Sequence, residues 1–449
     1  MNDAPHRFEL PSRAELEPWA GGALAQARRC GATAAEAHVS VSRGLSVTAR
    51  KGEVESVEFH HDRSLSVTVY FGQRSGSASS ADLSQRGLAQ MVEAACAIAR
   101  AGGEDPASGL ADPARLATEF PDLDLDHPWE IGTDAAIDRA RACEAAALAV
   151  DPRVTQSEGA SLHTSRGIGL YVNSHGFSGE QRGASHYLSC AAIATEKERM
   201  QRDDWYTSGR HPQDLDSAES VGRKAGERAV ARLNSRKLGT RTAPVLFVPD
   251  MARSLFGHLI GAISGGALYR KASFLLDKAG EQIFAPQVRL SQQPFIPRGA
   301  ASAAFDQEGV ATRERVLVDR GVLQGYVLGS YSARKLGLET TGNAGGVFNL
   351  VAEPGVLGFE QLLREMKQGL VVTELMGQGV NTVTGDYSRG AAGFWVENGA
   401  IAYPVEEITI AGNLATMFKS VRAIGNDVDT RGSIRTGSVL IESMTIAGN

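Results

Sequence analysis

The stretch HVSVSRGLSVTARKGEVESVEFHHDRSLSVTVYF, residues 38–71, decides the fold of the first half of the chain. Apolar and polar residues alternate along most of it, and a period of two is typical of a β-strand with one buried face. Residues 35–80 therefore predict an antiparallel meander of strands. Turn signals stand at three points, Arg43-Gly44, Lys51-Gly52 and Asp62-Arg63.

Helices are predicted on both sides of this meander. Ser12 followed by Glu15 forms a capping-box pattern, so we expect a helix of about 16 residues that continues until Gly31. Asp82 is placed to cap a second helix, which Gly102-Gly103 would end. Residues 1–103 thus read as one α+β unit.

The same order of elements returns further along the chain. Residues 104–130 are rich in Asp and Pro and have almost no periodicity, which indicates a linker. A helix over 133–150, strands within 162–198 and a capped helix over about 216–233 follow. Helix, meander, helix therefore occurs twice, and residues 131–238 form a second, structurally related α+β unit.

The last part of the chain, residues 239–449, has a different residue pattern. It begins with a short buried strand, PVLFVPD, and continues with many glycines and short apolar runs. Two hairpins are predicted, one turning at Asp319 to Gly321 and one at Asn398-Gly399, a type I′ signal. The fold class is therefore α+β, with two helix–meander–helix units followed by a β-rich, barrel-like C-terminal domain.

Composition excludes several classes of function. The chain of 449 residues has a net charge of -6 without a basic stripe, which argues against nucleic acid as a ligand. The four cysteines lie within the first 190 residues without C-x-x-C spacing, which favours reduced thiols in the cytoplasm. No signal peptide and no apolar run of about 20 residues is found, so no membrane association is expected.

The usual catalytic motifs are missing. The sequence has no phosphate-binding loop, no dinucleotide fingerprint, no nucleophile elbow and no H-E-x-x-H zinc motif. After His211 the chain contains one histidine, His258, and no cysteine. Because a catalytic zinc needs three protein ligands, a His- or Cys-based metal centre in the C-terminal domain is nearly excluded.

Four segments of the second half resemble the PmbA/TldE subunit of the TldD/PmbA (modulator of DNA gyrase) metallopeptidase family. They are GGALYRKASFLLDKAGEQIF (265–284), RVLVDRGVLQGYVLGSYSARKLG (315–337), GVNTVTGDYSRGAAGFWVENG (379–399) and PVEEITIAGNLATMFKSVRAIGND (404–427). The resemblance is specific from about residue 240 onward and rests on element order before that. It implies a cytosolic, two-subunit metallopeptidase that acts on peptides or small unfolded proteins.

In the catalytic TldD partner of this family, an H-E-x-x-x-H segment and a distant cysteine hold the metal. With the shared pair Arg270-Lys271 in register, the two histidine positions fall on Gly257 and Ala262, and the glutamate position falls on His258. The cysteine position falls on Ser433. Gly and Ala have no donor atoms, so the resemblance implies no catalytic and no metal-binding residue in this chain.

The leading hypothesis is therefore a non-catalytic, metal-free subunit. Its partner, a TldD-like chain, would supply zinc, base and activated water, and this chain would form a wall of the peptide chamber. The isolated chain could also pair with itself. Candidate residues for contact with the peptide or the partner are His258, Arg270, Lys271, Asn381, Asp386 and Arg389.

Structural explanations stay open for each of these residues. His258 could be a histidine hydrogen-bonded within a Gly/Ala-rich helix, Arg270 and Lys271 an ordinary solvated pair, and the loop 381–390 a turn that satisfies its own backbone. A metal site formed by His163, His175, His186 and Cys190 is a weak alternative. His60 and His61, beside the expected turn, are predicted to be surface residues.

Two other functions stay open. One is a self-sufficient peptidase with a carboxylate site drawn from Glu314, Asp386, Glu397, Glu406 and Glu407, although no two of these have a persuasive spacing. The other is a binding or adaptor protein, including a modulator of gyrase, which the unpatterned acidic charge disfavours.

Overall fold

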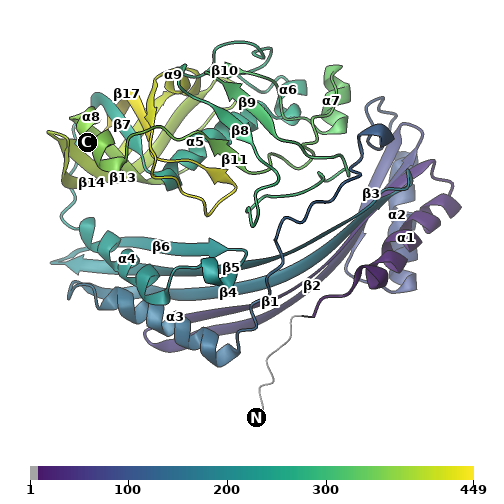
Figure 1. Ribbon diagram of the computed structural model, residues 1–449, viewed down its shortest axis with the longest axis horizontal. Coiled ribbons are helices and arrows are strands. Elements are labelled where there is room, and N and C mark those ends of the chain that lie inside the picture. Colours follow the sequence, from purple (N-terminus) through teal and green to yellow (C-terminus); the bar gives the residue numbers. More distant parts are fainter. Residues whose placement is uncertain (1–8, 449) are drawn as a thin grey trace.

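Six antiparallel strands form one long, curved sheet in the first half of the chain (Figure 1). The computed structural model describes residues 9–448. In the order β3-β2-β1-β4-β5-β6, the strands are β1 Ala34–Arg50, β2 Glu53–Phe71, β3 Arg74–Ser80, β4 Val154–Asn173, β5 Ser178–Glu196 and β6 Arg199–Gly209. The β1–β4 pair runs from Glu36↔Asn173 to Ala49↔Ala160 and joins the two predicted meanders into a single sheet.

Two of the three predicted turns in the first meander are wrong. The chain turns at Lys51-Gly52, as expected, but Arg43-Gly44 lies inside β1 and Asp62-Arg63 lies inside β2. Gly44 is required for another reason, because a Cβ there would lie 2.9 Å from the carbonyl oxygen of Thr164 on β4. A glycine that looked like a turn signal thus permits the close approach of two long strands.

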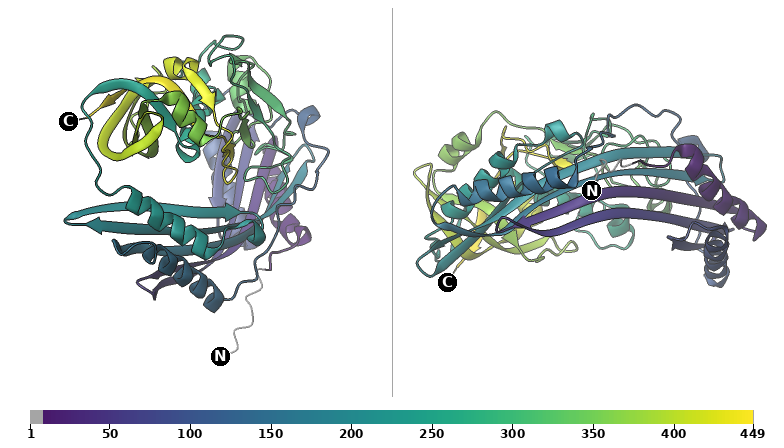
Figure 2. Two further views of the ribbon diagram at one scale, coloured as in Figure 1. Left: turned by 60° about the vertical axis from the view of Figure 1, so that its left-hand side comes forward. Right: turned by 90° about the horizontal axis from the view of Figure 1, so that it is seen from below.

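Four helices cover one face of this sheet, and the C-terminal domain lies over the other face (Figure 2). They are α1 Arg13–Arg29, α2 Gln85–Ala101, α3 Thr133–Leu148 and α4 Ala218–Ala231. The capping box is confirmed, since the Glu15 carboxylate accepts from the Ser12 backbone at 2.8 Å. Asp82 does not cap α2. Ser84 does, because the helix begins one residue after it, and its hydroxyl accepts from the backbone of Gly87 at 3.1 Å.

The expected barrel is present in the C-terminal region. Five strands close on themselves in the order β14-β13-β12-β7-β17, since β17 pairs back with β14. These are β7 Arg241–Phe247, β12 Gly369–Met376, β13 Asp386–Glu397, β14 Ala400–Asn413 and β17 Val439–Ala447, and β15 Val421–Ile424 extends the sheet from β17. The predicted hairpin turn at Asn398-Gly399 joins β13 and β14.

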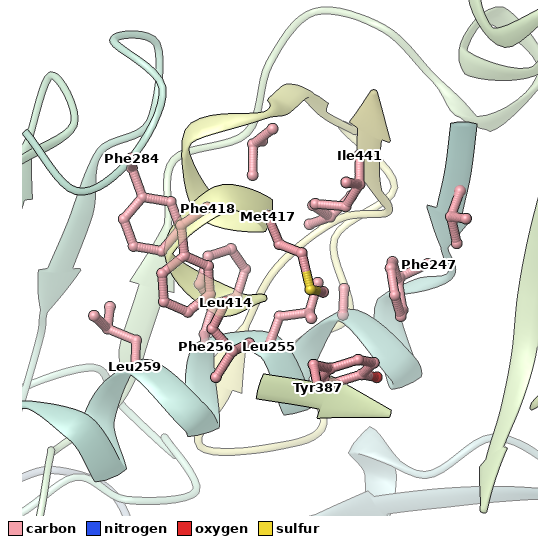
Figure 3. Packing of buried hydrophobic residues seen from close by; sticks show 14 of the residues in the cluster. Phe247, Leu255, Phe256, Leu259, Phe284, Tyr387, Leu414, Met417, Phe418 and Ile441 are labelled. Carbon is pink, nitrogen blue, oxygen red and sulfur yellow. The ribbon is translucent and has the colours of Figure 1, made fainter. Parts of the chain in front are cut away.

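A smaller sheet and five short helices complete this region. The sheet has the order β10-β9-β8-β11-β16, with β8 Leu290–Gln292, β9 Arg315–Asp319, β10 Val322–Leu323, β11 Leu350–Ala352 and β16 Ile434–Arg435. The helices are α5 Pro249–Ala262, α6 Gly265–Tyr269, α7 Ser330–Leu336, α8 Phe359–Met366 and α9 Leu414–Lys419. Aromatic stacking between Phe256, Phe284 and Phe418 packs α5 against α9 and the barrel (Figure 3).

The segment 104–130 is extended, as a linker should be, but it is tied to the C-terminal domain. It contains the 3₁₀ helix Pro113–Arg115, and Leu116 forms a β-bridge with Val310. The Tyr331 hydroxyl on α7 donates to Asp105 at 2.7 Å. The segment therefore fixes the C-terminal domain over the sheet. No helix within residues 9–448 is long and apolar enough to cross a membrane.

Candidate functional site

Helix α5 carries the central residue of the predicted site. Pro249 and Asp250 start the helix, as suits the first turn. One face is buried in the core through Leu255, Phe256, Leu259 and Ala262. The opposite face, with Ser254, Gly257, His258 and Gly261, is at least partly exposed. The helix lies on the side of the C-terminal domain that faces the six-stranded sheet (Figure 1).

The positions that the family resemblance assigns to metal ligands converge only in part. Ile434, next to Ser433, lies 4.0 Å from the point where a Cβ on Gly257 would stand, so these two distant segments run side by side. Gly257 is half-exposed, however, whereas Ala262 is fully buried. Positions five residues apart on an α-helix differ by about 140° around its axis, so the two do not share a face.

The residues at these positions do not fit a zinc ion. Gly257 and Ala262 offer no donor atom, and the serine hydroxyl of Ser433 is a poor substitute for a thiolate. Within residues 9–448, no three His, Cys, Asp or Glu side chains are grouped so that they could hold a metal.

His258 instead lies close to two residues of β13. Its ring lies 6.0 Å from the ring of Tyr387 in an edge-on arrangement. Burial lowers the pKa of His258, and the nearby positive charge of Arg389 lowers it further, so the imidazole is neutral at neutral pH. Burial raises the pKa of Tyr387 to about 12, although the positive charge of Arg389 and a hydrogen bond of poor geometry with its guanidinium oppose that rise.

Three buried polar atoms in this group lack a hydrogen bond of normal geometry. They are Nε2 of His258, the hydroxyl of Tyr387 and Nε of Arg389. The prediction from sequence named His258 and Arg389 but missed Tyr387. Tyr387 stands two residues before Arg389 on the strand β13, so both side chains lie on the same face of that strand. This spacing could have identified Tyr387 as part of the group.

The other predicted contact residues lie nearby and are mostly engaged locally. Arg270 is exposed and donates to the Tyr269 hydroxyl at 3.1 Å. The backbone of Phe274 donates to Thr382 at 3.0 Å, which brings the segment after the exposed Lys271 next to the loop 381–390.

In that loop the side chains hold the turn itself. Asn381 accepts from the backbone of Val383, and Asp386 accepts from the Thr384 hydroxyl and the Asn413 amide. These bonds correspond to the turn cluster that the sequence left open as an alternative.

The weak alternative of a metal site in the central unit is wrong for the described residues. His163 and His186 stand on adjacent strands but face opposite sides, since His163 pairs with Tyr187 and Thr164 pairs with His186. His186 is fully buried and bonded to Thr164 at 2.8 Å. His175 is exposed in the turn before β5. Of the two histidines predicted at the surface, His61 is exposed, but the half-buried His60 is bonded to Ser46.

Two carboxylates of the alternative peptidase hypothesis have partners of their own. Glu406 accepts from Gln201, and Glu407 is paired with Lys237 at 2.7 Å. The Gln201–Glu406 contact joins β6 to the C-terminal domain, and the Lys237–Glu407 pair lies at the surface.

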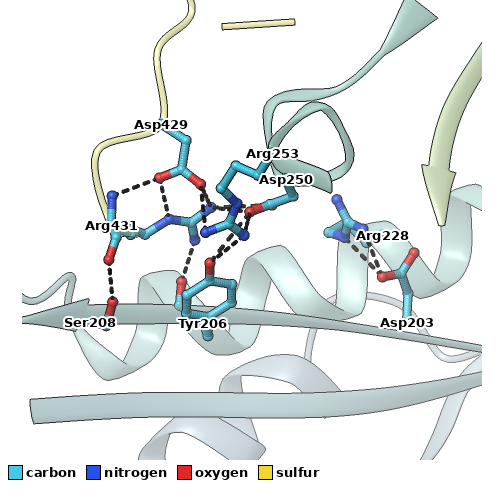
Figure 4. A network of polar contacts seen from close by, with 8 residues as sticks. All are labelled: Asp203, Tyr206, Ser208, Arg228, Asp250, Arg253, Asp429 and Arg431. Atoms are coloured by element: carbon cyan, nitrogen blue, oxygen red, sulfur yellow. Dashed lines mark hydrogen bonds and ion pairs between the residues drawn. The ribbon is translucent and has the colours of Figure 1, made fainter. Parts of the chain in front are cut away.

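A network that sequence analysis missed anchors the first turn of α5 to the sheet (Figure 4). Arg431 forms ion pairs with Asp250 at 3.2 Å and with Asp429 at 3.0 Å, and it donates to the Tyr206 carbonyl of β6 at 2.6 Å. Arg253 of α5 donates to the Tyr206 hydroxyl at 2.9 Å. Two local pairs were the signals for it, Asp429 with Arg431 and Asp250 with Arg253.

A cavity of about 610 Å³ lies between the sheet and the loops of the C-terminal domain. Glu36 of β1 and Asp306 contribute carboxylates to its wall. Hydroxyl groups of Tyr70 and Tyr171 donate to Glu36, and three backbone N–H groups donate to Asp306. Burial nevertheless raises the pKa of Asp306 to about 7. Sequence analysis missed this cavity because its wall residues are far apart in the chain.

Models of three protein-family domains match this chain in sequence order. They are PmbA/TldA metallopeptidase domain 1 over residues 35–99, the central domain over 126–233 and the C-terminal domain over 240–448. Together they cover the six-stranded sheet, its helices α2, α3 and α4, and the barrel region that carries α5.

Comparison with known proteins gives full-length relatives. Metalloprotease PmbA of Escherichia coli O157:H7 is 51% identical over 92% of each chain. The PmbA homolog of Haemophilus influenzae is 46% identical over 97% of this chain and 96% of its own. A TldD homolog from the same organism is 24% identical over 87% of this chain and 85% of its own.

Solved structures share the architecture. A candidate modulator of DNA gyrase from Bacteroides thetaiotaomicron has a TM-score of 0.92 at 30% identity, covering 97% of this chain and 99% of its own. TldE from Thermococcus kodakarensis has a TM-score of 0.83 at 22% identity. The match covers 95% of this chain and 99% of its own, which shows a shared fold. The fold is thus that of the gyrase-modulator and TldE structures. The chain belongs to the PmbA/TldD metallopeptidase family.

Proposed function

We propose that this protein is the non-catalytic, metal-free subunit of a cytoplasmic TldD/TldE-type metallopeptidase that acts on peptides or small unfolded proteins. The observation that carries the proposal is the absence of donor atoms at Gly257 and Ala262, the positions that correspond to metal ligands. A chain of this family without these ligands can contribute shape and contacts but no activated water.

The partner in this proposal is a TldD-like chain that holds zinc. The exposed small residues of α5 support a contact there, because Gly257 and Gly261 allow another backbone to come close. In this proposal, the face of α5 that carries His258 forms part of the wall of a cleft shared with the partner chain. The relative named TldE supports the pairing by its name and fold.

Metal analysis tests the proposal directly. The purified chain is treated with a chelator, reloaded with zinc and washed, and its zinc content is measured. We expect less than one tightly bound zinc per chain. Peptidase activity is then measured for this chain, for a TldD-like chain and for their mixture, and we expect activity only where the TldD-like chain is present. Stoichiometric zinc together with peptidase activity in the isolated chain would refute the proposal.

A further inference from the structure

Three unpartnered polar atoms beside α5 are unusual. Most buried polar atoms in folded proteins have a hydrogen-bond partner, and each exception calls for an explanation. Tyr387 is 1% exposed, and its hydroxyl has no partner of normal geometry. Nε2 of His258 and Nε of Arg389 are unpartnered around it. Their contacts join the three residues into one group, so one ligand could satisfy all of them.

The charge of this group selects the ligand. Arg389 carries a permanent positive charge, and among residues 9–448 it forms no ion pair, so that the Tyr387 hydroxyl is its polar neighbour. His258 is neutral, and the Tyr387 hydroxyl stays protonated. The group thus offers one positive charge and several donors, which matches a singly charged carboxylate better than a phosphate dianion.

Parts of this group reach the surface of the protein. The side chains of His258 and Arg389 are half-buried, although the three unpartnered atoms themselves are buried. The exposed face of α5 next to them carries Gly257 and Gly261, and nothing lies within 4 Å of a Cβ built on Gly261. An extended peptide could therefore lie along this face of the helix and place a carboxylate at Arg389.

We propose that Arg389, Tyr387 and His258 form a carboxylate-binding site for a peptide, in which the Arg389 guanidinium pairs with the carboxylate and the Tyr387 hydroxyl and His258 donate to it. This inference rests on the proposed function, because that function supplies a peptide as the ligand. The carboxylate belongs to the C-terminus of the peptide or to an acidic side chain.

Binding of defined peptides to the isolated, full-length chain tests the site. Calorimetry compares the acetylated peptide Ac-ALGAA as a free acid, the same peptide as its C-terminal amide, and the amide of Ac-ALEAA. We expect the free acid to bind at least about tenfold more tightly than its amide, and salt to weaken binding. If the glutamate-containing amide binds as tightly as the acid, the site accepts side-chain carboxylates; if it does not, the site reads the C-terminus.

Variants connect this binding to the named atoms. Arg389→Gln removes the charge at similar size and should weaken binding of the acid by about tenfold or more, to the level of the amide. Tyr387→Phe removes only the hydroxyl and should weaken it about threefold. The matched control, Arg422→Gln, alters an exposed arginine of the same domain that is paired with Glu365, and it should change nothing.

Two results would overturn the site. One is equal binding of the acid and amide peptides, or equal effects of Arg389→Gln and Arg422→Gln. The other is no binding of any peptide at about 10 mM, tenfold above a Kd of about 1 mM. The measurement needs neither zinc nor a second subunit, so its failure is separate from a failure of the metal analysis.

Discussion

The first turn and the middle of helix α5 differ in whether their polar groups have partners. At the first turn, Asp250 and Arg253 are enclosed in a network with Arg431 and the sheet, and their charged groups are paired (Figure 4). Two turns later, His258 and its neighbour Tyr387 hold buried polar atoms without partners. The same helix is thus anchored by ion pairs at one end and lies beside polar atoms without hydrogen bonds in its middle.

The difference separates positioning from recognition. A saturated network between α5 and β6 fixes where the helix stands over the sheet, and no ligand is needed to complete it. A group of unpartnered donors does need a ligand, since its hydrogen bonds form only when a ligand binds. Changes at the network should therefore affect folding stability, and changes at the middle of the helix should affect binding.

The largest effect is expected for Arg431→Ala. The guanidinium joins Asp250, Asp429 and the carbonyl of Tyr206, and it stacks on the Trp205 ring at 4.4 Å. Removing it leaves two buried carboxylates under-compensated, so the free energy of unfolding should fall by roughly 3–5 kcal/mol. Urea unfolding followed by circular dichroism measures this.

Arg422→Ala is the control for that change. This arginine is exposed and its pairing with Glu365 at 3.4 Å is a surface contact, so its loss should cost less than about 1 kcal/mol. Equal losses for the two variants would show that the network does not anchor the helix.

The network should also respond to acid. Burial alone would raise the pKa of Asp429, but hydrogen bonds from the Arg431 side chain and backbone outweigh it and lower the pKa to about 2, below the ordinary 3.8. A carboxyl whose folded pKa is depressed stabilises the protein above its unfolded pKa, and this contribution disappears as pH falls through the folded value.

Stability should therefore decline between about pH 4 and about pH 2 in excess of the decline seen in Asp429→Asn. Urea unfolding midpoints at several pH values in this range measure the difference. Parallel pH profiles for the two proteins would mean that Asp429 does not carry this contribution.

The smallest effect on stability is expected for Tyr387→Phe. Because the hydroxyl has no hydrogen bond of normal geometry to lose, removing it should change the free energy of unfolding by less than about 0.5 kcal/mol or raise it slightly. Tyr171→Phe is the matched variant, since that hydroxyl donates to Glu36 at 2.6 Å, and it should cost about 1.5–3 kcal/mol. Thermal unfolding of both variants compares them, and an equal loss would mean that Tyr387 is bonded.

Local patterns in the sequence predicted the local elements well. The capping box at Ser12, the alternation in the strands and the Asn398-Gly399 hairpin each involve residues close in the chain, and each is found in the structure. Gly44 was misread because its role depends on Thr164, a residue far along the chain that the pattern cannot include.

For the candidate site, too, some features follow from the sequence and others depend on packing. That Gly257 and Ala262 carry no donor atoms can be read from residue identity alone, and the family resemblance assigns metal-ligand positions to them. The group around Tyr387 cannot, because its atoms come from α5 and β13, more than a hundred residues apart, and their lack of partners is a property of packing.

The sequence by itself determined the α+β class, the order of the elements, the barrel-like character of the last domain and the family resemblance, because each depends on residue type and short spacing. Only the tertiary structure decided that the two meanders form one sheet, that α5 is anchored by Arg431, and that His258 meets Tyr387 and Arg389. Those contacts arise when distant segments are buried together, and burial turns ordinary side chains into paired or unpaired groups.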